Sequence, residues 1–212
     1  MAQKGTLTII SGFSGVGKGT IVRELLKRYG GYALSVSMTT RAPREGEENG
    51  IAYHFVTREE FEEGIGRDGF LEYARYGVNY YGTPRAFVEE MIEAGRDVIL
   101  EIEYQGALKV KEKMPEANMI YVVAPSARTV MERLIGRGTE SREEVARRMR
   151  AAVEEADHIK EYDYLLVNDD LDEAVETAHR LIQCGRLKTA ANTEKIDAIK
   201  AELSELAESG TL

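Results

Sequence analysis

The stretch that decides the fold of this chain is Gly12-Phe13-Ser14-Gly15-Val16-Gly17-Lys18-Gly19-Thr20. It lies between an apolar, β-branched run at residues 6–10 and a segment at residues 18–29 whose apolar side chains recur with helical spacing. Glycines let successive backbone N–H groups turn inward around phosphate oxygens, and the positive N-terminus of a following helix points at the same oxygens. Lys18 adds a full positive charge. The sequence therefore predicts a strand, a phosphate-binding loop and a helix.

The loop departs from the general pattern G-x-x-x-x-G-K-[ST] at Gly19, and the hydroxyl that usually follows the lysine comes one residue later, at Thr20. A metal-binding hydroxyl is therefore missing from its usual place. Mg²⁺ gives up its water reluctantly and binds phosphate oxygens readily. We expect Mg²⁺ to be held through nucleotide phosphates and water, and we assign no protein side chain as its ligand.

Three further apolar runs are predicted to be buried strands, at residues 97–102, 118–123 and 164–167. Each is next to a segment with helical character. Continuous apolar strands that alternate with helices are typical of a parallel sheet covered on both faces. We therefore expect an α/β fold with such a sheet as its core, formed by residues 4–36, 95–125 and 162–187.

Two segments interrupt this core. Residues 37–94 contain several tyrosines and scattered glycines but no continuous apolar strand, which predicts an insertion of mixed α and β structure. Residues 126–161, the lid segment, are rich in Arg and Glu and carry little apolar bulk. This composition predicts exposed helices with a mobile, charged connection.

Residues 188–212 are predicted to form a helical tail after the core. Its apolar side chains recur at spacings of three, four and three, as on one face of a helix, at Ile196, Ile199, Leu203 and Leu206. Such a stripe packs either on the chain's own core or against another copy, and we favour the first.

Composition argues against some partners and compartments. The chain has 212 residues, a formal net charge of -9 and a pI of about 5.1, so the phosphate backbone of nucleic acids would repel it. A small anionic ligand responds to the local field instead. The single cysteine, Cys184, cannot form an intramolecular disulfide; we expect an inert, partly buried thiol in a reducing cytoplasm. The apolar run at residues 7–10 is too short for a signal peptide, and none approaches the length of a membrane span.

The insertion contains a candidate second anion site. Arg41 and Arg44 are close together, and two guanidinium groups can hold a phosphate through paired hydrogen bonds. Tyr53 and Tyr81 offer hydroxyl donors in the same insertion. The alternative is a solvated arginine pair on a surface loop.

Over residues 4–187 the chain resembles the guanylate kinase family. The motifs occur in the family's order: Ser35-Val36-Ser37-Met38-Thr39-Thr40-Arg41-Ala42-Pro43-Arg44-Glu45-Gly46-Glu47, Asn49-Gly50-Ile51-Ala52-Tyr53-His54-Phe55, Phe70-Leu71-Glu72-Tyr73-Ala74, Asn79-Tyr80-Tyr81-Gly82-Thr83, Glu101-Ile102-Glu103-Tyr104-Gln105-Gly106-Ala107, Gly136-Arg137-Gly138-Thr139-Glu140 and Val167-Asn168-Asp169-Asp170. The chain departs at Gly19, where the family commonly has serine, and at Thr83, where a serine is often found and the hydroxyl is kept.

The resemblance implies how GMP is bound. The acceptor phosphate would be held by Arg41, Arg44, Tyr53 and Tyr81, with Arg148 reaching it from the lid segment. The guanine would be read by Ser37, Glu72 and Thr83, assisted by Glu101 or Glu103. The chemistry agrees, because one carboxylate can accept from the guanine N1–H and the exocyclic amine together. Adenine would place an unprotonated N1 against that carboxylate.

The resemblance also implies how ATP is bound. Its phosphates would lie in the loop at residues 12–20, with Arg133 and Arg137 of the lid segment. Asn168 and Asp169 would lie near the adenine; a helix-capping turn is an equally good interpretation of Asn168-Asp169-Asp170. The residues implied in catalysis are Lys18, Arg41, Arg137 and Arg148.

We therefore expect an enzyme that transfers the γ-phosphoryl group of ATP to GMP, and also to dGMP, with Mg²⁺. Two rivals stay open. One is a non-catalytic module of the same family that binds protein partners, which the intact loop with Lys18 disfavours. The other is a kinase for a different nucleoside monophosphate, which Glu72 together with Ser37 disfavours for adenine.

Overall fold

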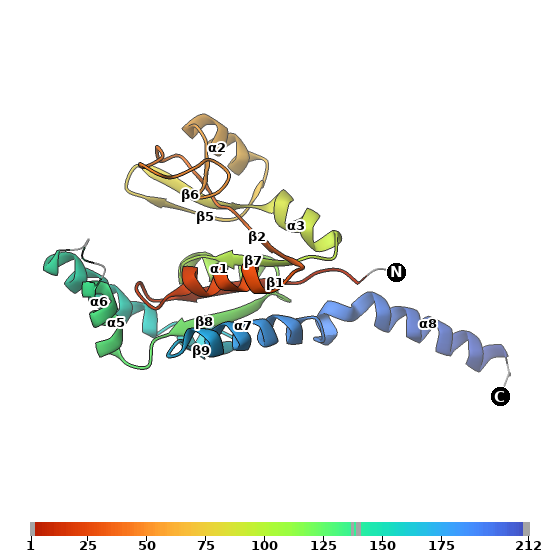
Figure 1. The fold of residues 1–212 in the computed structure, drawn as a ribbon. Helices are drawn as coiled ribbons and strands as arrows, with labels where there is room; N and C mark the ends of the chain where they lie inside the picture. Colours follow the sequence, from red (N-terminus) through yellow and green to blue (C-terminus); the bar gives the residue numbers. More distant parts are fainter. Residues whose placement is uncertain (1–2, 137, 139–140, 210–212) are drawn as a thin grey trace.

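The computed structural model of the chain describes residues 3–136, 138 and 141–209. Its core is a five-stranded sheet in the order β2-β7-β1-β8-β9, in which every neighbouring pair is parallel (Figure 1). The predicted strands are confirmed, whereas β2 has no counterpart in the prediction because so short a strand carries little pattern. The strands are β1 (Leu7–Gly12), β2 (Tyr32–Leu34), β7 (Asp97–Glu101), β8 (Asn118–Val123) and β9 (Tyr164–Val167).

Two hydrophobic cores hold helices against the two faces of this sheet. Ile10 of β1 belongs to one core together with residues of α1 and α7, and Leu7 and Ile9 of the same strand belong to the other together with residues of α3 and α4. Successive side chains of a strand point to opposite faces, so β1 contributes to both cores. The predicted α/β fold with helices on both faces is confirmed. The helices are α1 (Lys18–Arg28), α3 (Arg85–Glu93), α4 (Tyr104–Lys113) and α7 (Leu171–Gly185).

The insertion contains a second, four-stranded sheet in the order β4-β3-β6-β5, which pairs strands in both directions. Stacked rings hold helix α2 on this sheet, because the ring of Phe61 lies 4.3 Å from that of Phe70 and 5.2 Å from that of Tyr80. The predicted mixed structure is thus present. Its elements are β3 (Met38–Thr39), β4 (His54–Phe55), α2 (Arg58–Gly66), β5 (Phe70–Tyr76) and β6 (Asn79–Pro84).

The lid segment contains α5 (Ala127–Gly136), α6 (Arg142–Ala156) and the short 3-10 helix η1 (Ile159–Glu161). Ser141 caps the N-terminus of α6, because its hydroxyl accepts a hydrogen bond from the backbone N–H of Glu144 at 3.2 Å. The insertion and the lid segment lie on two sides of the loop that follows β1 (Figure 1). The loop therefore has the insertion on one side and the lid segment on another.

The tail forms the 3-10 helix η2 (Thr189–Asn192) and helix α8 (Thr193–Ser209), which extends away from the body of the molecule (Figure 1). The four apolar side chains of its stripe are 46% to 62% exposed. Our expectation that this stripe docks on the chain's own core is therefore wrong, because α8 points away from the sheet. Cys184 is exposed, so the expectation of a partly buried thiol is also wrong. In the part of the chain that the structure describes, no helix is long and apolar enough to cross a membrane.

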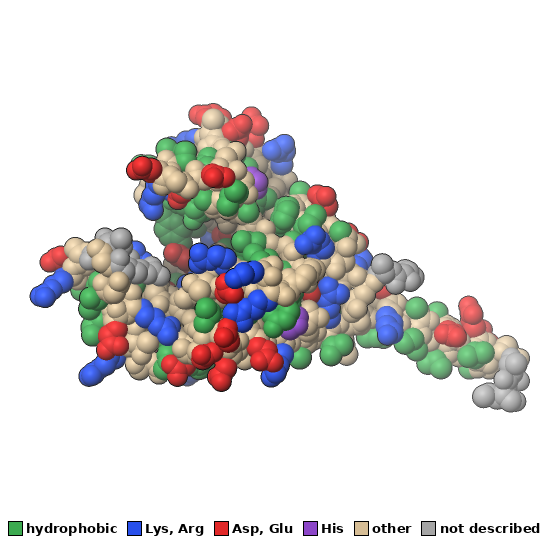
Figure 2. Space-filling model, viewed as in Figure 1, with side chains coloured by type: hydrophobic (Ala, Val, Ile, Leu, Met, Phe, Trp, Pro, Cys, Tyr) green, Lys and Arg blue, Asp and Glu red, His purple; other side chains and the backbone are tan. Residues whose placement is uncertain are grey.

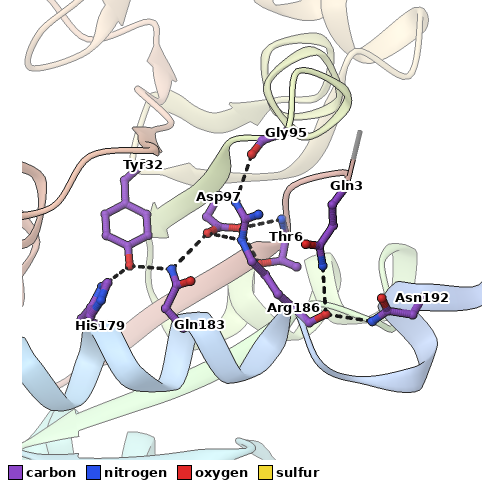
Figure 3. Close-up of polar contacts among 9 residues, drawn as sticks. All are labelled: Gln3, Thr6, Tyr32, Gly95, Asp97, His179, Gln183, Arg186 and Asn192. Carbon is purple, nitrogen blue, oxygen red and sulfur yellow. Dashed lines mark hydrogen bonds and ion pairs between the residues drawn. The ribbon is translucent and has the colours of Figure 1, made fainter. Parts of the chain in front are cut away.

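A polar network joins the end of α7 to the start of β7 and to the segment before β1 (Figure 3). The carboxylate of Asp97, at the start of β7, accepts hydrogen bonds from the backbone N–H and the hydroxyl of Thr6, both at 2.9 Å. Arg186 donates its Nε–H to the same carboxylate at 2.8 Å and an Nη2–H to the carbonyl of Gly95 at 3.0 Å. The Asp97 side chain is only 2% exposed. Arg186 therefore compensates a buried charge.

Candidate active site

The loop after β1 can turn sharply because glycines stand where a side chain would not fit. The φ angle is 149° at Gly12 and 93° at Gly17. A Cβ at Gly12 would lie 2.2 Å from the carbonyl oxygen of Val122, and one at Gly17 would lie 2.5 Å from the side-chain nitrogen of Asn168. Gly17 also precedes α1 and has no side chain with which to cap it. The N-terminus of α1 is thus suited to an anion.

Charged side chains from two elements surround this loop. Lys18 donates hydrogen bonds from its ammonium group to the carbonyl oxygens of Gly12 and, at 3.1 Å, of Phe13. Arg148, on α6 of the lid segment, donates to the hydroxyl of Ser14. The structure therefore brings Arg148 to Ser14 and Lys18, from which the sequence separates it by more than a hundred residues.

A hollow of about 290 Å³ lies against the loop. Besides loop residues it is lined by Arg23, on α1, and by Glu101, at the end of β7. Burial raises the pKa of Glu101, and the charges of Lys18 and Arg23 oppose that rise. Sequence reasoning missed Arg23, although it stands four residues after Gly19 and so on the same face of α1.

The segment after β9 supports the loop. Asn168 is buried and donates from its side-chain amide to the carbonyl of Val16 at 2.7 Å, while Arg133 donates to the carbonyl of Asn168 at 3.0 Å. Asp170 caps α7 by accepting from the backbone N–H of Glu173 at 3.0 Å, so the capping interpretation is confirmed for that residue. Asp169 is exposed beside it. Arg137 lies outside the described residues.

A cleft of about 810 Å³ connects the loop with the insertion and the lid segment. Figure 2 shows the molecule hollowed between the insertion and the remainder of the chain. The cleft brings together residues expected at both anion sites and at the base site, whereas Arg41 and Thr83 are not in its lining. Its lining includes Gly12, Ser14, Lys18, Ser37, Arg44, Tyr53, Glu72, Tyr81, Glu101, Glu103 and Arg148.

Glu72 is the buried carboxylate of this cleft, with 8% of the residue exposed. Burial raises its pKa, and the hydrogen bond that Thr83 donates to its Oε1 at 2.8 Å opposes the rise. Thr83 itself is fully buried. The structure thus places Thr83 against Glu72, where its hydroxyl orients the carboxylate that faces the cleft.

The two acids between which the sequence cannot choose occupy different parts of the cleft. Glu101 lies at the phosphate loop, where a Cβ on Gly19 would come within 3.4 Å of its carboxylate. Glu103 instead accepts a hydrogen bond from the hydroxyl of Tyr76 at 2.6 Å. Tyr76 lies on the same strand as Glu72 and four residues further on, hence on the same face. Glu103 is therefore the acid on the side of Glu72.

Arg41 is held within the insertion by a carboxylate that sequence reasoning missed. Its Nη1 and Nη2 donate to the two carboxylate oxygens of Glu47 at 2.9 and 3.0 Å. Its guanidinium also lies 5.4 Å from the ring centre of Tyr53, which packs edge-on against Tyr81. Arg44 reaches the cleft itself. The candidate acceptor-phosphate residues thus form one cluster, in which Glu47 pairs with Arg41.

A glycine loop between the central strand of a parallel sheet and a helix, facing a cleft with a buried carboxylate and arginines, defines a P-loop nucleotide-binding kinase. The family model described as guanylate kinase matches residues 4–184. The chain therefore belongs to the guanylate kinase family, as the sequence motifs indicate.

Relatives and a solved structure agree with this family. A guanylate kinase of Salmonella typhi is 46% identical over 205 residues, which cover 96% of this chain and 99% of the relative. One from Latilactobacillus sakei is 44% identical over 189 residues, covering 89% of this chain and 93% of the relative. The crystal structure of guanylate kinase from Anaplasma phagocytophilum is similar with a TM-score of 0.72 at 30% identity, over 92% of this chain and 94% of that one.

Proposed function

We propose that this chain transfers the γ-phosphoryl group of ATP to GMP, and also to dGMP, giving ADP and GDP. The observation that carries the proposal is the single cleft in which Lys18 of the phosphate loop and Glu72 of the insertion both lie. Family membership supports ATP:GMP phosphotransfer as the activity. The proposal includes ATP and GMP as the ligands of the chain and the cytoplasm as its location.

Phosphoryl transfer needs alignment and charge stabilisation more than covalent chemistry. The backbone of the loop and Lys18 would hold the donor phosphates, with Arg133, Arg137 and Arg148 adding positive charge from the lid segment. The accepting phosphate oxygen of GMP is already ionised near neutral pH, so the step requires no general base. The contact between Arg148 and Ser14 supports a lid segment that reaches the loop.

The acceptor would lie across the cleft from the donor. Arg41, Arg44, Tyr53 and Tyr81 would hold its phosphate so that an oxygen approaches the γ-phosphorus in line with the leaving group. Glu72 would accept from the guanine N1–H and exocyclic amine, with Ser37 donating to O6. Both the insertion (residues 37–94) and the lid segment would move inward, which excludes water that otherwise hydrolyses ATP.

The loop suits Mg²⁺ that arrives with the nucleotide. Within the described residues there is no group of three or more His, Cys, Asp or Glu side chains that could hold a metal ion. Glu101 lines the hollow at the loop, and its carboxylate could accept hydrogen bonds from water on such an ion. When bound, Mg²⁺ would neutralise charge on the phosphates.

A coupled assay of ADP release with GMP, AMP, CMP or UMP as acceptor tests the proposal. We expect GMP-dependent release and little with the other three. Lys18→Met should abolish turnover, because the positive charge at the donor phosphates is lost. It should leave the circular dichroism spectrum unchanged, because the ammonium group donates to carbonyl oxygens of the loop itself. Absence of GMP-dependent ADP release from the wild type would refute the enzyme, and equal rates with AMP would refute the guanine site.

A further inference from the structure

The pair between Arg41 and Glu47 is too specific for an incidental surface contact. Both guanidinium nitrogens Nη1 and Nη2 meet the two oxygens of one carboxylate, the geometry in which charge-assisted hydrogen bonds are strongest. The side chains are 14% and 22% exposed. Pairing with Arg41 lowers the pKa of Glu47, so the carboxylate is charged at neutral pH.

Glu47 is itself anchored to the loop that contains both arginines. Its Oε2 accepts a hydrogen bond from the backbone N–H of Arg44 at 2.8 Å, in addition to its bond with Arg41. One carboxylate thus fixes the side chain of Arg41 and the backbone of Arg44. Because the loop holds the carboxylate, Arg41 is tied to a defined position and not to another flexible side chain.

Aromatic rings complete the support of Arg41. Its guanidinium carbon lies 5.4 Å from the ring centre of Tyr53 and 5.7 Å from that of Phe55. The two rings restrict the orientation of the guanidinium plane, and the paired hydrogen bonds to Glu47 fix its position. An arginine without these contacts would lose conformational freedom when a phosphate binds, and that loss would weaken binding.

We propose that Glu47 is a positioning residue for the acceptor phosphate, which acts by holding Arg41 and Arg44 in their binding arrangement before GMP arrives. The inference rests on the proposed GMP-binding role of the two arginines. The alternative predicts the opposite effect on GMP affinity: the carboxylate of Glu47 would compete with the phosphate for Arg41 and weaken binding. The pre-ordered arrangement described above favours positioning.

Kinetics of Glu47→Ala, Glu47→Gln and the control Glu48→Ala separate these possibilities. Glu48 is the next acid along the same loop and is exposed. For Glu47→Ala we expect the KM for GMP to rise about 10- to 100-fold, the range that loss of charge-assisted hydrogen bonds produces. The KM for ATP should stay within about twofold, since the loop for ATP is elsewhere. Glu47→Gln keeps acceptor and shape and should recover part of the loss, while Glu48→Ala should behave as the wild type.

Several outcomes would overturn the inference. A KM for GMP that stays within about twofold of the wild type in Glu47→Ala would show that Glu47 does not position the arginines. A KM that falls in both Glu47 variants would show that Glu47 competes with the phosphate. Equal rises for GMP and ATP would indicate general damage. If Glu47→Ala does not fold, calorimetric titration of Glu47→Gln with GMP decides, and unchanged affinity refutes the inference. A wild type without GMP-dependent ADP release would instead refute the proposed function.

Discussion

Replacing Arg186 by methionine should leave the buried carboxylate of Asp97 without its compensating charge. In the native network this carboxylate accepts from Arg186 Nε, at 3.0 and 2.8 Å to its two oxygens, and from the N–H and hydroxyl of Thr6. Methionine fills much of the volume of the arginine stem but donates no hydrogen bond. The remaining donors are neutral, so an ionised group with 2% exposure loses its charged partner.

The size of the effect follows from this burial. Removing one partner of a buried ion pair costs about 3–5 kcal/mol. The lost bond from Arg186 to the carbonyl of Gly95 adds to the same disruption. For a protein of this size each kcal/mol lowers the midpoint of thermal unfolding by about 2–4 °C, which gives a fall of about 6–20 °C.

Urea unfolding followed by circular dichroism measures the change, with Arg180→Met as matched control. Arg180 is on α7, which ends directly before Arg186, and it pairs with Glu176, but the two side chains are 70% and 55% exposed. Its loss should cost less than about 1 kcal/mol. Adding Asp97→Asn to Arg186→Met should restore part of the stability, because it removes the uncompensated charge. A loss below about 1 kcal/mol for Arg186→Met, or no recovery in the double variant, would refute the reasoning.

Three further predictions concern the base site and the tail. Glu72→Gln should lower kcat/KM for GMP by about 100-fold, because an amide nitrogen then faces guanine donors; steady-state kinetics would contradict this if the loss were less than about fivefold. Because burial raises the pKa of Glu72, its acceptor charge is lost as pH falls, from a higher pH than for an exposed carboxyl. Thr83→Val removes the hydrogen bond that opposes this rise, so the acid limb of the pH profile of kcat/KM should move to higher pH than in the wild type. Titration of the GMP phosphate affects the wild type and Thr83→Val equally, so it does not contribute to the difference between their profiles. Acid limbs that coincide in the two enzymes would contradict the prediction. Leu203→Lys should change the free energy of unfolding by less than about 0.5 kcal/mol, since Leu203 is 62% exposed; a larger loss in urea unfolding would mean that α8 is packed.

Local pattern predicted the parts of the fold that depend on neighbouring residues. The run before Gly12 and the glycine spacing up to Lys18 specify a strand, a turn and a helix, because apolar period and backbone freedom act over a few residues. The resemblance of motifs extended this to most residues of the cleft. The tail helix was predicted from the same kind of pattern, but its packing was predicted wrongly. An apolar stripe shows which face of a helix is apolar and does not show which surface that face contacts.

Contacts between distant segments were not predictable in this way. Glu101 ends β7 and Glu103 comes two residues later, yet Glu101 lies at the loop and Glu103 binds Tyr76. Nothing in the local sequence marks Asp97 as the buried partner of Arg186, eighty-nine residues away. Such pairs arise from the order of strands in the sheet and the crossing of helices over it.

The sequence by itself determined that this chain forms an α/β protein with a phosphate loop at Gly12 to Thr20, because that loop needs only glycines, a strand before it and a helix after it. Only the tertiary structure decided which side chains share the cleft with the loop. It placed Arg148 on Ser14, Thr83 against Glu72 and Glu47 against Arg41. Hydrogen bonds and ion pairs form over about 3 Å, and the folded chain alone brings these atoms that close.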